Sequence, residues 1–382
     1  MKLVFISDNF PPVVDGVGDY TYNLSQEFAR NGHEVYVICA RKAAIISQTE
    51  KSDRITVLPV VGKWNYKAIH TILSCIKQIK PDWVIPQYVP YSYNYYGVPF
   101  WFYWLIGALK KNHFPVAITF HEIFIDLQLH KPKYILVALA QRLITFLIAR
   151  KVDRIVVSIE RVRRQLRRFE AKMTRIPVGS NIRPFQLSQQ EIGSVRKKIA
   201  PGGEFVLSSF GIRNQTTLIH LLKRLIQEKQ HVKLVLLGKL TPQAISEITG
   251  LSNQHDLHGK IYLPGYLNSR ELYTTLRCAD AFVLLEENRG GVTTKSGSIA
   301  AAYSAGLPII GTKGHMTDHF FADRKNILFT DAKSLDRMTD DLKSFIQNKD
   351  NLLTVLKEGS KRTYEEQLSW EKIYSAYRKV LH

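Results

Sequence analysis

The stretch FPPVVDGVGDYTYNLSQEFARNGHEVYVI, residues 10–38, decides the fold prediction for this chain. It opens as a loop rich in Pro and Gly, and apolar residues then recur at helical spacing from Tyr20 to Phe28. Gly32 stands where a glycine commonly ends a helix, and the run at 33–40 is typical of a strand. Because an apolar run also precedes the loop, the stretch predicts strand, loop, helix and strand in succession.

The same alternation continues along the whole chain. Apolar runs predict strands at 2–8, 33–40, 55–60, 82–87, 116–120 and 154–159, and again at 205–211, 232–239, 261–266, 281–286 and 307–312. Helical segments separate these runs, and two amphipathic helices at 334–348 and 370–381 close the chain. Strands that alternate with helices form parallel sheets covered on both faces. We therefore expect an α/β fold of two doubly wound, Rossmann-like domains facing a central cleft.

A polar stretch between Ile182 and Gly202, with Pro184 and Pro201, is the expected domain boundary. The expected parts are an N-terminal domain at 1–185, a C-terminal domain at 195–365 and a returning C-terminal helix at 366–382.

Composition and charge limit where the protein works. The chain has three scattered cysteines without zinc spacing, which favours a reducing compartment. The N-terminus lacks a signal-peptide pattern, and the apolar stretch from Tyr134 to Ala149, broken by Gln141 and Arg142, falls short of the roughly 20 residues that span a membrane. A cytoplasmic protein is expected.

The excess positive charge lies mainly in the first half. Of 53 Lys and Arg and 33 Asp and Glu, residues 1–185 hold 26 and 13. We expect an anionic partner, either a phosphorylated acceptor or the inner face of a membrane to which the protein attaches peripherally. No nucleic acid is expected, because helix-turn-helix, zinc-finger and RRM signatures are missing.

The opening stretch resembles the start of glycosyltransferase family 4, with Gly16, Gly18, Gly32 and His33 at the matching positions. The resemblance continues in order over nearly the whole chain, through the segments 81–88, 119–122, 154–166, 176–182, 209–215, 265–285 and 302–312. It implies the GT-B architecture, with an acceptor-binding first domain and a nucleotide-sugar-binding second domain. The implied reaction moves a sugar from a nucleotide-diphosphate sugar to a hydroxyl of a sugar or lipid-linked acceptor, with retention of configuration.

The leaving diphosphate develops negative charge and needs cations or N–H donors placed in advance. Arg213 matches the family's phosphate-binding arginine, and Lys295 lies in a Gly- and Thr-rich segment that opens a helix. We predict that phosphate is held by Gly291, Val292, Thr293, Thr294 and Ser298. The alternatives are that Arg213 is only a surface arginine and that the segment around Lys295 is only a well-capped helix start.

The remaining candidates are split between donor and acceptor. Glycine at Gly16 and Gly18 would let a donor approach the backbone, and Tyr266 lies where the family binds the donor base. The resemblance places His121 near the reacting sugar, as a catalytic residue with Arg213 and Lys295; a structural histidine is the alternative. Acceptor binding is assigned to Glu122, Tyr91 and Tyr93, the tyrosines from an aromatic and basic segment that would also suit a membrane interface or a core helix.

The chain departs from the family at its paired glutamates, whose positions fall on Thr293 and Ala301. A non-catalytic relative therefore stays open, as do a nucleotide-sugar 2-epimerase and a binding protein for an anionic polymer. Asp-x-Asp is missing, so neither metal nor other cofactor is predicted, and UDP is the expected nucleotide by its frequency in the family.

Overall fold

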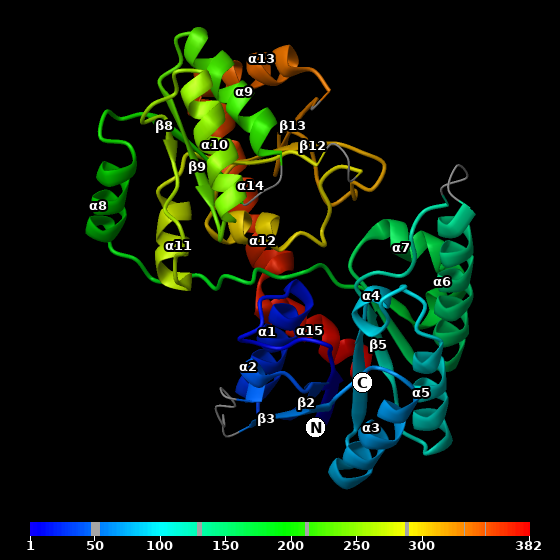
Figure 1. The fold of residues 1–382 in the computed structure, drawn as a ribbon. Helices are drawn as coiled ribbons and strands as arrows, with labels where there is room; N and C mark the ends of the chain where they lie inside the picture. Colours follow the sequence, from blue (N-terminus) through cyan, green and yellow to red (C-terminus); the bar gives the residue numbers. More distant parts are fainter. Residues whose placement is uncertain (47–53, 128–131, 211–213, 287–289, 332, 348) are drawn as a thin grey trace. The chain divides into compact units, whose positions relative to one another are not determined.

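The computed structural model describes residues 1–46, 54–127, 132–210, 214–286, 290–331, 333–347 and 349–382 (Figure 1). They form two compact units, Met1–Val178 with Trp370–His382, and Gly179–Ser369. Each unit is built on one parallel sheet, which confirms the predicted α/β class. The second unit begins at Gly179, whereas the sequence prediction started it at 195.

The first unit has a seven-stranded sheet in the order β3-β2-β1-β4-β5-β6-β7. Its strands are β1 Lys2–Ile6, β2 Glu34–Ala40, β3 Ile55–Val61, β4 Trp83–Tyr88, β5 Ala117–Phe120, β6 Arg154–Val157 and β7 Met173–Arg175. Its helices are α1 Gly16–Arg30, α2 Ala43–Ile46, α3 Tyr66–Ile79, α4 Pro90–Tyr93, α5 Phe100–Lys111, α6 Pro132–Lys151, α7 Glu160–Gln165, the 3-10 helix η1 Arg167–Lys172, and α15 Trp370–Leu381.

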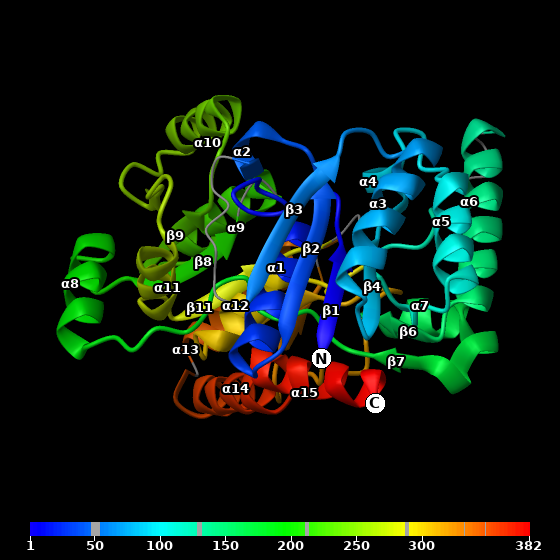
Figure 2. The ribbon, with the colours of Figure 1, turned by 90° about the horizontal axis from the view of Figure 1, so that it is seen from below.

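The last helix, α15, completes the core of the first unit. It lies beside α1 in both views (Figures 1 and 2) and buries Trp370, Ile373 and Tyr377 in the same apolar cluster as Phe28 of α1. Its final turn is held where the Trp83 indole N–H donates to the Leu381 carbonyl at 2.9 Å. The sequence-distant C-terminus is therefore part of this unit's folding core.

The helix α6 packs beside α5 (Figure 2) with one face buried and the other apolar but exposed. It is twenty residues long, and by length and composition it alone among the described helices could cross a membrane. This corrects our expectation of a shorter segment, because the helix extends beyond the apolar run at both ends. Gln141 and Thr145 face inward, whereas Leu136, Leu139 and Leu143 are 71%, 51% and 53% exposed.

The second unit has a six-stranded sheet in the order β10-β9-β8-β11-β12-β13. Its strands are β8 Phe205–Phe210, β9 Val232–Leu237, β10 Ile261–Tyr262, β11 Ala281–Leu284, β12 Ile309–Thr312 and β13 Leu328–Thr330. Its helices are α8 Gln189–Ile199, α9 Gln215–Gln227, α10 Pro242–Gln254, α11 Ser269–Arg277, α12 Gly297–Ser304, α13 Leu335–Gln347, α14 Lys349–Thr363 and the π-helix η3 Tyr364–Leu368. Successive strand residues such as Val206 and Leu207 enter separate apolar clusters, so helices cover both faces.

Two local features differ from the sequence prediction. The polar stretch expected to be a linker contains α8, which begins at a capping box between Ser188 and Glu191. The helix α1 begins at Gly16, earlier than its apolar periodicity, because Asp15 caps it.

Candidate functional site

Both sheets contain a switch point, where the strand order reverses. In the first sheet β1 lies between β2 and β4, and in the second β8 lies between β9 and β11. Ligands of open α/β sheets bind outside the carboxyl ends of the strands at such points. The loops after β1, β4, β8 and β11, together with the adjoining loop after β5, are therefore the candidate site, described below for each unit separately.

The glycine-rich loop after β1 has one packing glycine and one open glycine. The Gly18 N–H donates to Oδ2 of Asp15 at 2.7 Å, and a Cβ on Gly18 would lie 3.1 Å from the backbone carbonyl of Asn9. Glycine at this position lets the loop pack on its own helix, a requirement that the sequence prediction did not include, and the predicted donor contact of Gly18 stays a prediction. Gly16 is exposed, and a Cβ there would meet no described atom within 4 Å, so its approach role stays a prediction.

Asp8 is a polar residue at this switch point that the family motifs did not single out. Its carboxylate accepts a hydrogen bond from the Trp64 indole N–H at 2.5 Å and lies 3.7 Å from the Lys42 ammonium. The Trp64 ring stacks on Trp101 with centroids 5.9 Å apart. The only sequence signal for Asp8 was its position directly after the apolar strand FIS.

His121 follows β5 and is held by two other elements, β4 and α1. Its backbone N–H donates to the Tyr88 carbonyl at 3.1 Å, and its Nε2 lies 2.8 Å from Oε1 of Gln87 on β4. The ring of Tyr20, from α1, meets the imidazole edge-on with centroids 4.9 Å apart. The predicted histidine is therefore half-buried in a defined orientation at the carboxyl end of the sheet.

The predicted acceptor residues divide into exposed and buried side chains. Tyr93 is 1% exposed, and its hydroxyl donates to the carbonyls of Ile6 and Gln87. Its acceptor role is wrong, because it ties the ends of β1 and β4 together from inside the core. Tyr91 is 44% exposed and Glu122 is exposed, so both can be reached from solvent.

In the second unit, the segment after β11 folds back on itself. Gly290 and Gly291 have φ of 83° and 86°, and a Cβ on Gly291 would collide with the backbone of Gly314. The Gly291 N–H donates to the Glu286 carbonyl at 3.1 Å, and the Val292 N–H donates to the Thr312 carbonyl at 3.0 Å.

Thr294 is also engaged inside the protein. Its N–H and its hydroxyl both donate to Oδ2 of Asp318, at 3.1 and 2.5 Å. The amides of Gly291, Val292 and Thr294 are thus bonded to other groups of the second unit, which corrects their prediction as phosphate donors.

The start of α12 keeps the features that suit an anion. Ser296 caps the helix through the Ile299 N–H, and Gly297 and Ser298 form its first turn with half-buried Thr293 and Lys295 just before it. First-turn N–H groups lack intrahelical partners and carry the positive end of the helix dipole.

Asn181 lies against this helix start, with its amide nitrogen 3.7 Å from a Cβ position on Gly297. Its Oδ1 is buried without a hydrogen-bond partner among the described residues, which marks an unused acceptor. The family segment at 176–182 drew attention to this stretch without assigning the residue a role.

Two predicted donor residues remain. Arg213 lies outside the described residues. Tyr266 follows β10 and is 80% exposed, so its ring is available to a ligand.

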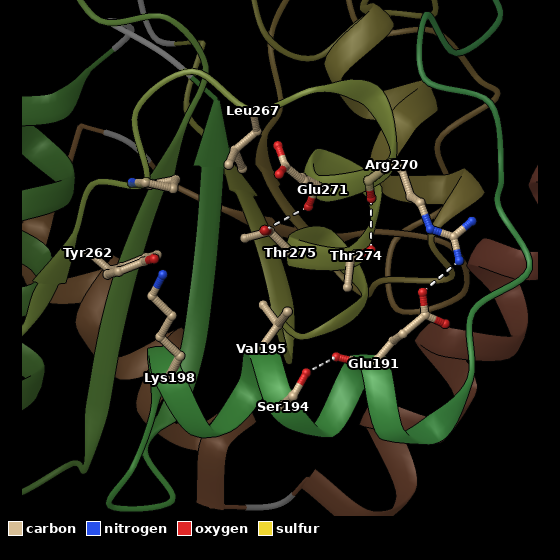
Figure 3. Close-up of a pocket in the computed structure, with 11 residues that line it drawn as sticks. Glu191, Ser194, Val195, Lys198, Tyr262, Leu267, Arg270, Glu271, Thr274 and Thr275 are labelled. Carbon is tan, nitrogen blue, oxygen red and sulfur yellow. Dashed lines mark hydrogen bonds and ion pairs between the residues drawn. The ribbon is translucent and has the colours of Figure 1, made fainter.

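A cavity of about 320 Å³ between α8, α11 and the end of β10 contains none of the predicted site residues (Figure 3). At one end the Arg270 guanidinium bonds the Glu191 carboxylate at 2.6 Å. Its threonines, Thr274 and Thr275, donate to carbonyls of their own helix. We therefore keep the switch points as the site. Within the described residues, no group of three or more His, Cys, Asp or Glu is placed to hold a metal.

Two family models match the chain in succession. The model described as Glycosyltransferase Family 4 matches residues 14–182, and the one described as Glycosyl transferases group 1 matches residues 206–363. Alpha-monoglucosyldiacylglycerol synthase of Streptococcus pneumoniae is 21% identical, over 85% of this chain and 74% of that protein. The enzyme of the same name from Acholeplasma laidlawii is 23% identical, over 86% and 84%.

The fold has close counterparts among solved structures. Anabaena Alr3699/HepE in complex with UDP superposes with a TM-score of 0.73, at 11% identity, and the match covers 100% of this chain and 99% of that one. A sequence identity of 11% supports a shared fold only. The evidence for sugar transfer comes from the two family models.

Proposed function

Because the chain belongs to the glycosyltransferases that join a Family 4 region to a group 1 region, we propose that it transfers a hexose from a UDP-sugar to a hydroxyl of a lipid acceptor. The transfer retains the anomeric configuration and uses no metal. The observation that carries the lipid acceptor is α6, a basic-ended helix with an exposed row of leucines on the acceptor-side unit. Both curated relatives are named as diacylglycerol glycolipid synthases.

The donor diphosphate binds at the start of α12. Lys295 and the first-turn N–H groups of Gly297 and Ser298 supply positive charge, with the Thr293 hydroxyl beside them. Arg213, which follows β8 in the sequence and lies outside the described residues, supplies a second cation with two parallel donors. These groups stabilise the charge that develops on the leaving nucleotide, which is the part a metal ion takes elsewhere.

The missing glutamate pair is compensated inside the same unit. Ala301 is 2% exposed in the interior of α12, so a carboxylate at that position would be buried. The Asn181 Oδ1, which is buried and has no hydrogen-bond partner among the described residues, becomes an acceptor for a ribose or sugar hydroxyl once the atoms that cover it move. This assignment favours an active transferase over a non-catalytic relative.

His121 acts at the transferred sugar. Its imidazole stands at the carboxyl end of the first sheet, where it contacts a sugar hydroxyl and helps fix the reacting carbon. The acceptor hydroxyl attacks from the face that the diphosphate leaves, so no protein nucleophile is required.

The acceptor unit meets an anionic membrane. Leu136, Leu139 and Leu143 enter the interfacial region, while Lys133 and Arg150 near the helix ends meet lipid phosphates. The protein is then a cytoplasmic, peripheral enzyme that takes its acceptor from the membrane.

A transfer assay tests the proposal. UDP-glucose labelled in the sugar is incubated with diacylglycerol in vesicles that contain phosphatidylglycerol, with EDTA present. The expected product is a glycolipid with the α-linkage of the donor, read by NMR at the anomeric carbon. A β-linked product, complete loss of transfer in EDTA, or UDP-glucose hydrolysis to a free epimerised sugar would contradict it.

A further inference from the structure

We propose that Gln87 and Tyr377 are positioning residues for His121. Gln87 holds the neutral imidazole with its proton on Nε2, and the C-terminal helix α15 keeps Gln87 in place through Tyr377 and Thr119. The inference rests on the proposed role of His121 in sugar transfer.

The amide of Gln87 has a fixed orientation. The side chain is 1% exposed, and its Nε2 donates to the Ile85 carbonyl at 3.2 Å and to Oγ1 of Thr119 at 3.4 Å. Its Oε1 is therefore the atom that meets His121 Nε2 at 2.8 Å. An amide oxygen only accepts hydrogen bonds, so the imidazole must donate at Nε2. In the neutral ring the lone pair is then on Nδ1.

The support behind Gln87 comes from the other end of the chain. The Tyr377 hydroxyl of α15 lies 2.9 Å from Oγ1 of Thr119 and accepts a hydrogen bond from the Tyr20 hydroxyl at 3.0 Å. Tyr377 and Tyr20 are 0% and 2% exposed. Burial raises the pKa of Tyr377 to about 12, and the hydroxyl, like that of an ordinary tyrosine, is protonated at neutral pH; either it or the Thr119 hydroxyl donates in the bond between them.

Tyr20 also connects Tyr377 to His121. Tyr20 touches the imidazole directly with its ring edge and touches Tyr377 with its hydroxyl. The path from α15 to His121 therefore runs both through Thr119 and Gln87 and through Tyr20. A fixed tautomer and ring plane let the His121 imidazole hydrogen-bond a sugar hydroxyl through one defined nitrogen.

The test reads the tautomer and the reaction together. Full-length protein with ¹⁵N-labelled histidine is compared by NMR for wild type, Gln87→Leu, Gln87→Glu and Tyr377→Phe, and each is assayed for sugar transfer. In Gln87→Leu, we expect loss of the Nε2–H signature and a fall in kcat of about 10- to 100-fold with donor KM within about twofold. Gln87→Glu restores an acceptor and the Nε2–H form, and it moves the acid limb of the pH–rate profile to higher pH because the carboxylate stabilises the imidazolium. Tyr377→Phe lowers kcat by about 2- to 10-fold.

Matched controls separate positioning from stability. Gln141→Leu removes another buried amide of the first unit, one that bonds the Gly97 carbonyl at 3.0 Å, and Tyr303→Phe removes a buried hydroxyl that donates to the Asn326 carbonyl at 3.0 Å. Neither control changes the His121 tautomer. If folded Gln87→Leu keeps the wild-type tautomer and kcat, the inference is wrong while sugar transfer stands. If His121→Ala keeps the wild-type kcat, the proposed role of His121 is wrong regardless of the tautomer.

Discussion

Asp19, in the first turn of α1 beside the glycine-rich loop, is an ionisable group that folding makes less acidic. Burial, and then repulsion from Asp15, raises the pKa of Asp19 from 3.8 to about 6. A carboxyl with a raised folded-state pKa binds protons more tightly in the folded protein than in the unfolded chain. Its ionisation therefore destabilises the fold above pH 6, and this destabilisation disappears as the pH falls from about 6 to 4.

Replacing Asp19 by Asn is expected to stabilise the first unit at neutral pH. The gain is about 1 kcal/mol once the partial exposure of the group is allowed for, and it should vanish near pH 4. Thermal melting of the two proteins across this pH range measures the difference. An equal difference at every pH would show that Asp19 does not titrate in this window, and Asp256→Asn, at an exposed side chain of the second unit, provides a control for a change of net charge.

At the residue scale, sequence motifs identified the loops of the candidate site but not the structural role of each glycine. Gly18 and Gly291 are glycines because a Cβ would meet backbone of their own unit. A motif cannot distinguish this requirement from close approach of a ligand, since both exclude a side chain. Likewise, the aromatic run alone did not show which of its tyrosines are exposed, and Tyr93 is buried.

Among the elements, the segment from Gly290 to Thr294 is held by the loop that follows β12. Gly291 packs on Gly314 and Thr317, and Thr294 bonds Asp318. This packing positions the start of α12, so the shape of the proposed diphosphate site depends on contacts that no ligand makes.

Gly291→Ala is therefore expected to destabilise the second unit by about 2–3 kcal/mol and to weaken donor binding. Its φ of 86° and the Gly314 backbone both oppose a methyl group. Gly193→Ala in α8, where a Cβ meets nothing within 4 Å, should instead stabilise by about 0.5–1 kcal/mol. Chemical denaturation of both variants checks this, and a wild-type midpoint for Gly291→Ala would refute the packing argument.

The helix α15 is the second element with a clear energetic role. Trp370 is 2% exposed in the core of the first unit. Trp370→Ala should cost about 3–5 kcal/mol, whereas Trp104→Ala, at a side chain that is 56% exposed, should cost little. Hydrogen exchange locates the loss: protection should fall in β1 and α1, and loss confined to the second unit would contradict the assignment.

Element by element, long apolar runs were predictable and short or polar ones were not. The strands β7 and β13 have three residues each, too few for periodicity. The helix α8 buries only Ile199 of its own residues, so its sequence reads as polar linker. The Ser188–Glu191 capping box was its available signal.

At the scale of the whole molecule, positive charge and exposed leucines occur in the same unit. The first unit, residues 1–178 and 370–382, holds 28 Lys and Arg against 14 Asp and Glu, and its helix α6 exposes Leu136, Leu139 and Leu143. Charge attracts an anionic surface at long range, and buried apolar area holds the protein there.

Wild-type protein is expected to bind vesicles that contain phosphatidylglycerol and to lose most of this binding at high salt. Replacing Leu136, Leu139 and Leu143 by Ser should abolish sedimentation with the vesicles at low salt. The matched control replaces Ile245 and Val355, exposed apolar residues of the second unit, by Ser. Equal loss in both variants, or none in either, would contradict docking through α6.

The two-unit α/β fold could be predicted from the alternation of strands and helices, and the chemistry from an ordered series of motifs. What sequence could not provide was the link between distant parts, such as the bond from Tyr377 to Thr119. Such contacts depend on where α15 packs in the folded protein, and no local sequence pattern indicates that position.

The most direct test is donor binding by the intact protein. Thermal stability is measured against UDP-, GDP-, ADP- and TDP-sugars for wild type, Arg213→Ala, Lys295→Met and the control Lys357→Met. Ligand that binds only the folded state raises stability by RT ln(1 + [L]/Kd). We expect UDP-sugars to raise the melting temperature of wild type and the control, and both site variants to lose the shift. A wild type that no nucleotide sugar stabilises, or a shift that survives in both site variants, would contradict a donor site at the switch point of the second sheet.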